Sequence, residues 1–219
     1  MDVTVEEARE LVADQALWPR VRDFLWDFAP QVHPSWLEDM FSRRDAEVQS
    51  GGDMESPRVK RFVLDSLGVE PCFHTFPKDD GSRLMLLDGA TLVSIAKWLG
   101  ALACAESLRH VTSGAVVREL KAALPGVYPE VFGYTMYFKD LVSRGAAESR
   151  SEDVVAEVVE NGYGLLFSVF SDLPSSLVAR LKFKLPRNLR VFASPREIKL
   201  STVLKLLKLK FPEAYSLCC

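Results

Sequence analysis

Hydrophobic residues recur at intervals of three and four along most of this chain, which places them on one face of an α-helix. The clearest run covers residues 88–110. There, Gly100 and Ala101 are small enough for another element to pack closely. The expected buried face of this helix consists of Leu92, Ile95, Ala96, Leu99, Leu102 and Ala103. The same spacing predicts further helices over residues 6–15, 18–29, 34–41, 57–67, 113–124, 127–141, 154–170 and 194–211.

One stretch alternates instead of following the helical spacing. Residues 72–76 read CFHTF, residues 77–81 read PKDDG, and RLMLL follows at 83–87. Two apolar runs joined by a turn-forming segment are typical of a β-hairpin. The fold class predicted by the whole pattern is mainly α, a compact helical domain with one small β-hairpin.

A polar segment divides the predicted helices. Residues 49–56 read QSGGDMES, a composition typical of a linker. It separates amino-terminal helices in 1–48 from a main helical body in 57–219, which we expect to form one continuous structural unit.

The composition is that of an ordinary soluble globular protein. Of 219 residues, 48% are hydrophobic and 26% are charged. The longest uncharged stretch, residues 161–171, is shorter than the roughly 18 residues that a membrane span needs. The acidic amino terminus lacks the pattern of a secretory signal, so we expect the protein to stay in the compartment where it is made. Four cysteines are too few for a disulfide framework, which favours a reducing compartment.

Charge is divided unevenly along the chain. Residues 1–173 hold 17 Lys and Arg against 28 Asp and Glu, whereas residues 174–219 hold 10 Lys and Arg against only Glu197 and Glu213. A basic end on an acidic body favours an acidic partner at that end, whether nucleic acid, an anionic membrane surface or an acidic protein.

The segment RLKFKLP at 180–186 carries much of this basic charge. If its backbone is extended, its lysines lie on one face and Leu181, Phe183 and Leu185 on the other. A helix is the alternative for this part of the chain. Such a face suits an acidic partner, a strand edge that resists pairing, or simple solvation. The candidate partner-binding residues are Arg180, Lys182, Lys184, Arg187 and Arg190.

The last predicted helix is both basic and amphipathic, with Leu200, Leu204, Leu207 and Phe211 as its main stripe. It suits an anionic membrane surface, or packing against the body with the lysine stems at the margin. Binding of nucleic acid is disfavoured because aromatic residues are sparse among the basic ones and the isoelectric point is about 5.7.

No catalytic constellation accompanies these patterns. The chain has three histidines and no nucleophile-elbow, catalytic Cys-His or phosphate-binding glycine motif. Gly162 and Gly164 lie in a helical pattern, which indicates a flexible or closely packed point. Cys72 and His74 lack a second ligand pair at zinc spacing. We therefore predict no catalytic residues, no cofactor and no metal, and a protein that is not an enzyme.

The region from Leu86 to Phe138, with WLGALACAESLRHVTSGAVVRELKAALPG, resembles the SctK family of bacterial type III secretion sorting platforms. RLKFKLP is similar to that family's RLxLRLP-type segment, and SPREIKLSTVLKLLKLKFPEAY to its basic terminal helix. The acidic amino-terminal segment and the linker depart from the family pattern.

This resemblance implies a mostly helical, non-catalytic adaptor. Its implied partners are the pod protein of the sorting platform and the cytoplasmic domain of the inner-membrane ring protein, with no nucleic acid and no direct membrane insertion. The implied location is cytoplasmic, peripheral to the inner membrane at the secretion apparatus. The alternative is a protein that binds nucleic acid or an anionic membrane surface through its basic carboxyl-terminal segment.

Overall fold

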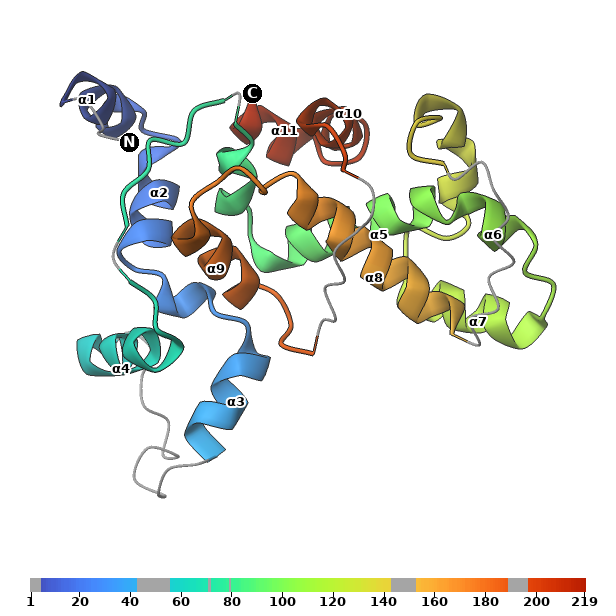
Figure 1. Cartoon of the computed structure of the whole chain (residues 1–219), viewed down its shortest axis with the longest axis horizontal. Helices are drawn as coiled ribbons and strands as arrows, with labels where there is room; N and C mark the ends of the chain where they lie inside the picture. The colour runs from blue at the N-terminus through green and yellow to red at the C-terminus, as the bar shows by residue number, and fades with distance from the viewer. Residues whose placement is uncertain (1–4, 43–55, 71, 79, 143–152, 189–196) are drawn as a thin grey trace. The chain divides into compact units, whose positions relative to one another are not determined.

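The computed structural model describes residues 5–42, 56–70, 72–78, 80–142, 153–188 and 197–219 (Figure 1). Within these ranges the regular structure consists of eleven α-helices and four short 3-10 helices, with no strand. The chain divides into two compact units. The first comprises Met1–Gly89, Asp172–Leu189 and Glu213–Cys219, and the second comprises Ala90–Ser171 and Arg190–Pro212. The mainly α prediction is confirmed.

The first unit has an aromatic core. Phe24 packs edge-on against Phe28 and Phe76, with ring centroids 5.7 and 5.8 Å apart, and all three side chains are fully buried. Local signals set its helix ends, since α4 has a proline in its first turn and ends at Gly68 with a φ of 64°. Its helices are α1 (Val5–Ala13), α2 (Trp18–Leu25), η1 (Ala29–Gln31), α3 (Pro34–Ser42), α4 (Pro57–Leu67), η2 (Ser82–Leu86), α9 (Ser175–Phe183) and, from Glu213 on, α11 (Pro212–Cys218).

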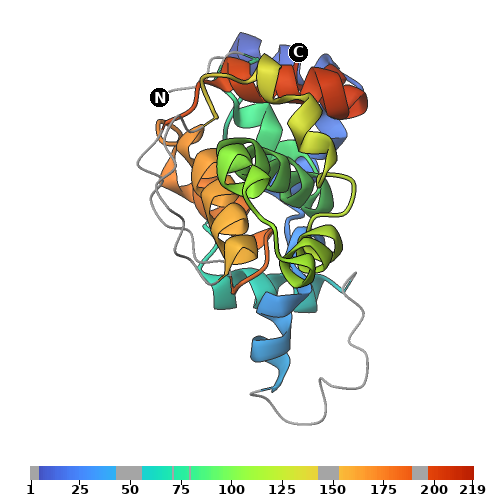
Figure 2. The same cartoon turned by 90° about the vertical axis from the view of Figure 1, so that its right-hand side faces the viewer.

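The second unit is built on two 15-residue helices, α5 (Gly89–Ala103) and α8 (Val154–Ser168), which lie side by side (Figures 1 and 2). A Cβ placed on Gly100 would overlap the carbonyl oxygen of Val158 and lie 2.9 Å from the nitrogen of Gly162. Glycines at this crossing therefore let the two backbones touch, as predicted for Gly100. The remaining helices of this unit are α6 (Ala105–Arg109), α7 (Gly114–Ala123), η3 (Glu130–Gly133), η4 (Thr135–Tyr137) and α10 (Leu200–Lys210).

The predicted β-hairpin is wrong. Residues 72–77 run without helix or strand structure, and most of the second apolar run lies in η2. Leu84, Met85, Leu86 and Leu87 are all buried. A half-buried strand exposes alternate residues, so four consecutive buried side chains do not fit one.

Other predicted helices also differ. The helix predicted over 18–29 ends at Leu25, and the separate helix η1 begins at Ala29. The helix over 88–110 is divided near Cys104 into α5 and α6, although its predicted face is buried. Residues 127–141 form only the short helices η3 and η4 instead of one continuous helix. The last helix, predicted to begin at Ser194, begins at Leu200, since residues 197–199 are described and are not helical.

Some sequence predictions fall outside the described residues. They include the linker at 49–56 apart from Ser56. The division into 1–48 and 57–219 stays a prediction. Among the described helices none is long and apolar enough to cross a bilayer.

Candidate functional site

The basic segment predicted as a partner surface is helical rather than extended. Arg180 and Lys184 are four residues apart at the end of α9, so they lie on the same side, and each is only 2% exposed. Lys182 is exposed. Of the two conformations left open for this segment, the structure has the helix, and a helix turns residue 184 toward the core instead of placing both lysines on one outward face.

Arg180 holds together three separate parts of the first unit. Its guanidinium donates from Nη1 to the carbonyl oxygen of Phe24 at 3.0 Å and from Nη2 to that of Glu70 at 2.7 Å. It also lies 5.5 Å from the centroid of the Phe28 ring. Its buried Nε has no hydrogen-bond partner in the described part of the chain. These contacts assign Arg180 a role in the fold.

Lys184 anchors the segment that leads into α5. Its Nζ donates to the carbonyl oxygens of Met85, at 2.8 Å, and Leu87, at 2.6 Å. Burial lowers the pKa of Lys184 to about 7, the charge of Asp88 opposes this shift, and the charge of Arg20 adds to it. Like Arg180, Lys184 supplies donors to backbone carbonyls inside the unit.

Two of the predicted residues remain at the surface and flank one tryptophan. The Nζ of Lys182 lies 6.0 Å from the ring centroid of Trp36, and the Cζ of Arg187 lies 5.5 Å from it. We call Trp36, Lys182 and Arg187 the Trp36 surface. Arg190 lies outside the described residues.

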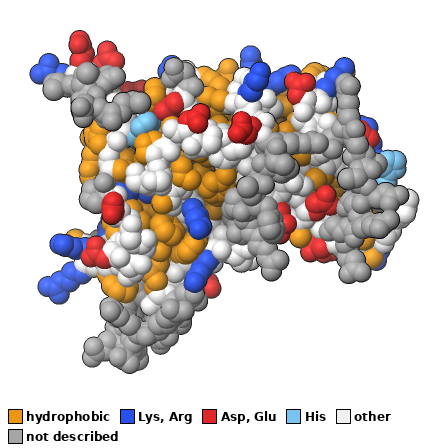
Figure 3. All heavy atoms as spheres, in the orientation of Figure 1, with side chains coloured by type: hydrophobic (Ala, Val, Ile, Leu, Met, Phe, Trp, Pro, Cys, Tyr) orange, Lys and Arg blue, Asp and Glu red, His pale blue; other side chains and the backbone are white. Residues whose placement is uncertain are grey.

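The Trp36 surface is rigidly positioned. The indole Nε1 of Trp36 donates to the carbonyl oxygen of Leu185 at 2.9 Å, and its ring meets that of Phe183 edge-on at 5.0 Å. The backbone N–H of Arg187 donates to Ser35 Oγ at 2.9 Å. Basic side chains lie among hydrophobic ones over α3 and α9 in Figure 3. Cations beside an aromatic ring suit a partner that presents carboxylates next to apolar groups.

The basic charge of α10 is partly engaged within the second unit. Lys205 Nζ donates to the carbonyl oxygen of Tyr137 at 2.7 Å, and Lys210 Nζ to Glu130 Oε2 at 2.6 Å. The buried residues of this helix are Val203, Leu206 and Leu207. Of the expected apolar stripe, only Leu207 is therefore buried.

The remaining polar groups do not assemble a metal site among the described residues, where no group of three or more potential ligands occurs. His74 Nε2 lies 3.0 Å from Asp80 Oδ2. Burial alone would raise the pKa of Asp80, but hydrogen bonds from His74 and Ser82 lower it. The contact between His74 and Asp80 links two residues that lie shortly before η2.

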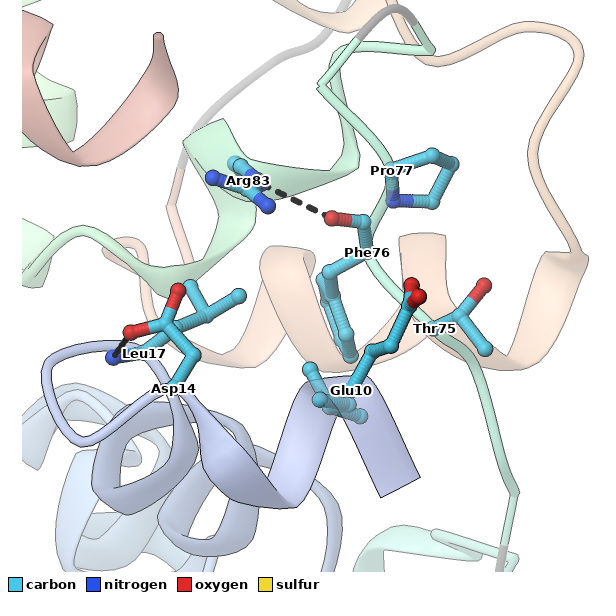
Figure 4. A pocket seen from close by; sticks show the side chains of 8 residues that line it. Glu10, Asp14, Leu17, Thr75, Phe76, Pro77 and Arg83 are labelled. Carbon is cyan, nitrogen blue, oxygen red and sulfur yellow. Dashed lines mark hydrogen bonds between the residues drawn. The ribbon is translucent and has the colours of Figure 1, made fainter. Parts of the chain in front are cut away.

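A pocket of about 310 Å³ lies between α1 and residues 75–77 (Figure 4). Its lining combines Leu11, Leu17 and other apolar groups with Glu10, Asp14 and Arg83. Asp14 Oδ1 accepts from the backbone N–H groups of Ala16 and Leu17, at 3.0 Å each, so this carboxylate also stabilises the turn after α1. Sequence reasoning missed the pocket because its walls are distant in the chain.

A comparison with known families identifies the chain. The family model described as YOP proteins translocation protein K (YscK) matches residues 25–217. The chain belongs to the YscK family. It is therefore a type III secretion accessory protein of the SctK family, as the resemblance predicted. Comparisons with curated proteins and with solved structures gave no match.

In this YscK-family protein, the match covers most helices of both units, including α9 and the basic residues at its end, but it leaves out α1 and all of α2 except Leu25. The matched range also contains Trp36, which sequence reasoning did not connect with Lys182 or Arg187. The proline at the start of the predicted helix over 34–41 and the tryptophan within it were visible in the sequence. Nothing in the sequence, however, shows that Trp36 bonds to Leu185, which lies 149 positions further along the chain, just after α9.

Proposed function

We propose that this protein is a non-catalytic adaptor that links the cytoplasmic domain of the inner-membrane ring protein to the pod protein of the sorting platform. Family membership supports a role in type III secretion. The observation that carries the adaptor function is the Trp36 surface, where two exposed basic residues flank an ordered aromatic ring. Aromatic and arginine side chains of this kind are enriched in protein interfaces.

The proposed partner at the Trp36 surface presents an acidic segment. Lys182 and Arg187 attract carboxylates, and the rings of Trp36 and Phe183 provide an apolar contact between them. Arg180 and Lys184 contribute indirectly, because their hydrogen bonds to backbone carbonyls hold the end of α9 in place. The proposed location is the cytoplasmic face of the inner membrane at the secretion apparatus.

Charge reversal at the Trp36 surface tests this function. The double variant K182E/R187E should lose affinity for one of the two partners by about tenfold or more, because rim charges become repulsive. It should keep its affinity for the other partner. The measurement is capture of purified pod protein and of purified ring-protein cytoplasmic domain, each tested separately, with helicity followed by circular dichroism.

A matched control is available in the same unit. The variant R58E/K78E makes the same change of charge at two exposed positions outside the Trp36 surface, and it should bind both partners as the wild type does. Equal capture by K182E/R187E and the wild type would remove the Trp36 surface from the proposal. Failure of the wild type to capture either partner would contradict the adaptor function itself.

Binding through the basic carboxyl-terminal segment to nucleic acid or anionic membranes is the second hypothesis. The internal contacts of Lys205 and Lys210 weigh against it, because these cations are already engaged with Tyr137 and Glu130. Salt-sensitive retention of the protein on DNA or on anionic vesicles would support it.

A further inference from the structure

The segment that sequence patterns marked as a strand has no partner strand among the residues that the structure describes. Residues 72–77 connect α4 to η2 without regular structure and run past α2 toward α1 (Figure 1). Phe73, His74 and Thr75 make no backbone hydrogen bond within the described part of the chain. Phenylalanine and threonine favour strands. The segment therefore combines strand-forming residues with unpaired backbone groups.

Side chains hold the chain just before this segment and at its end. The carbonyl oxygen of Glu70 accepts from Arg180 at 2.7 Å, and that of Phe76 accepts from Arg83 Nε at 2.8 Å. Between them, the His74 ring lies edge-on to Phe76 at 5.0 Å and bonds to Asp80. Phe76 is fully buried and has a left-handed φ of 53°, which turns the chain at the end of the segment. A segment held in this way loses little further conformational freedom when it pairs.

Exposed aromatic groups accompany the unpaired backbone. Phe73 is 44% exposed and its ring lies 6.1 Å from that of Trp26, which is 49% exposed. The ring centroid of Trp26 in turn lies 5.7 Å from that of Trp18. Large exposed aromatic side chains in contact with one another are characteristic of interaction surfaces. In Figure 3, hydrophobic side chains gather over the part of the first unit where α2 lies.

The pocket lies at the far end of the same segment, where Thr75, Phe76 and Pro77 form one wall. Glu10 faces this wall from α1 and has no polar partner among the described residues, and Figure 4 shows its carboxylate directed toward Thr75. Asp14 adds a second carboxylate. The guanidinium of Arg83 is engaged with the carbonyl oxygens of Phe76 and, at 3.5 Å, Leu217. The lining thus has two carboxylates against one guanidinium, and this excess of negative charge favours a cationic side chain whose apolar stem contacts Leu11 and Leu17.

We propose that residues 73–75 form an open β-edge that pairs with an extended segment of a partner protein, and that a Lys or Arg side chain of this segment enters the pocket beside Glu10. Backbone pairing would supply affinity, and the pocket would select the basic side chain. Pairing at this edge is independent of the adaptor function and is measurable without any secretion subunit.

The probe is a set of fluorescein-labelled, N-acetylated heptapeptides of alternating valine and threonine, with one lysine at each position in turn. Fluorescence anisotropy with the full-length protein should show binding for the peptides whose lysine is in register with the pocket. Nuclear magnetic resonance should show that the backbone amides among residues 73–75 that pair with the peptide become protected from hydrogen exchange. If no peptide of the set binds, or if protection appears elsewhere, the proposal is wrong.

Methylation of the peptide backbone tests pairing directly. N-methyl groups at alternate residues remove the donors from one peptide edge only. One methylated series should bind like the parent, and the other should bind about tenfold more weakly or worse, because several hydrogen bonds are lost together. Equal binding by both series would overturn the pairing.

A charge reversal tests the pocket. E10K should weaken binding of the lysine peptide by about fivefold, the scale of an exposed ion pair, and should leave unchanged the binding of the same peptide with norleucine in place of lysine. E6K, on the same helix but outside the pocket lining, is the matched control and should bind both peptides as the wild type does. Equal effects of E10K and E6K would remove the pocket from the proposal.

Discussion

The two units differ in whether buried cations serve their backbone carbonyl groups. In the first unit, the carbonyl oxygens of Phe24, Glu70, Met85 and Leu87 accept hydrogen bonds from the buried cations Arg180 and Lys184. In the second unit, Lys97 and Lys205 also donate to carbonyl oxygens, but neither lysine is buried. Its long helices α5 and α8 bond their own carbonyls internally and approach each other through glycine.

This difference follows from where the helices end. The last carbonyls of a helix have no partner within it, and short helices and irregular segments leave many such groups in a small volume. A long cationic side chain reaches several of them at once. Within a long regular helix most carbonyl groups already accept a hydrogen bond from the helix itself. How closely two such helices pack is then limited by the size of the side chains between them. The first unit should therefore be sensitive to the loss of donors, and the second to the gain of volume.

Added volume at the helix crossing should have the largest effect. G100A places a methyl group against the backbone of α8, which cannot move aside as a flexible side chain would, so we expect a loss of about 4 kcal/mol in the free energy of unfolding. G133A, in the same unit but with open space around it, should change the free energy by less than about 0.5 kcal/mol. Urea denaturation measures both, and similar values for the two variants would show that the crossing tolerates a side chain.

Loss of the Arg180 donors should have the next largest effect. R180M keeps much of the buried volume but leaves the carbonyl oxygens of Phe24 and Glu70 without these hydrogen bonds, so we expect a loss of about 2 to 3 kcal/mol. K182M removes an exposed cation from the same helix and serves as the control, with a change below about 0.5 kcal/mol. If R180M is as stable as the control, the donor argument for the first unit fails.

The pH dependence of stability should show the smallest effect, and it tests Lys184. Burial lowers the pKa of this lysine to about 7 from its ordinary value near 10.5. Between these values the unfolded chain binds more protons than the folded one, so stability rises with pH. The cost of burying the charge is thus greatest below pH 7 and is relieved as the pH rises toward 10.5.

The comparison variant is K184M, which lacks the titrating group. From pH 7 to pH 8 we expect the wild type to gain about 1 kcal/mol relative to K184M in urea denaturation, since one pKa unit corresponds to about 1.4 kcal/mol. Parallel pH profiles for the two proteins would mean that Lys184 does not titrate in this range.

Much of the helical framework was predictable from the sequence. The bounds of α4 followed from Pro57 and Gly68, and the predicted face of α5 is buried. Gly100 was expected to allow close packing, and it does so against α8. These features depend on residues that are near one another in the chain, so periodicity and capping signals are enough to locate them.

The candidate site was predictable only in part. Lys182 and Arg187 are exposed as expected, but the same run of basic residues supplies Arg180 and Lys184 to the core. Alternation in RLKFKLP fits an extended backbone, and a four-residue separation fits a helix, so the segment by itself leaves both conformations open. The hairpin prediction was wrong for a related reason. Its two apolar runs contact distant parts of the chain instead of pairing with each other as strands, and the local pattern does not show this.

The sequence by itself determined that this protein is mainly helical, where several helices begin and end, and which family it belongs to. Only the tertiary structure decided which basic residues are buried, that Trp36 lies between Lys182 and Arg187, and that the backbone of residues 73–75 has no hydrogen-bond partner within the described ranges. Helix formation depends on neighbouring residues, whereas the position of a buried cation depends on carbonyl groups that distant segments bring to it.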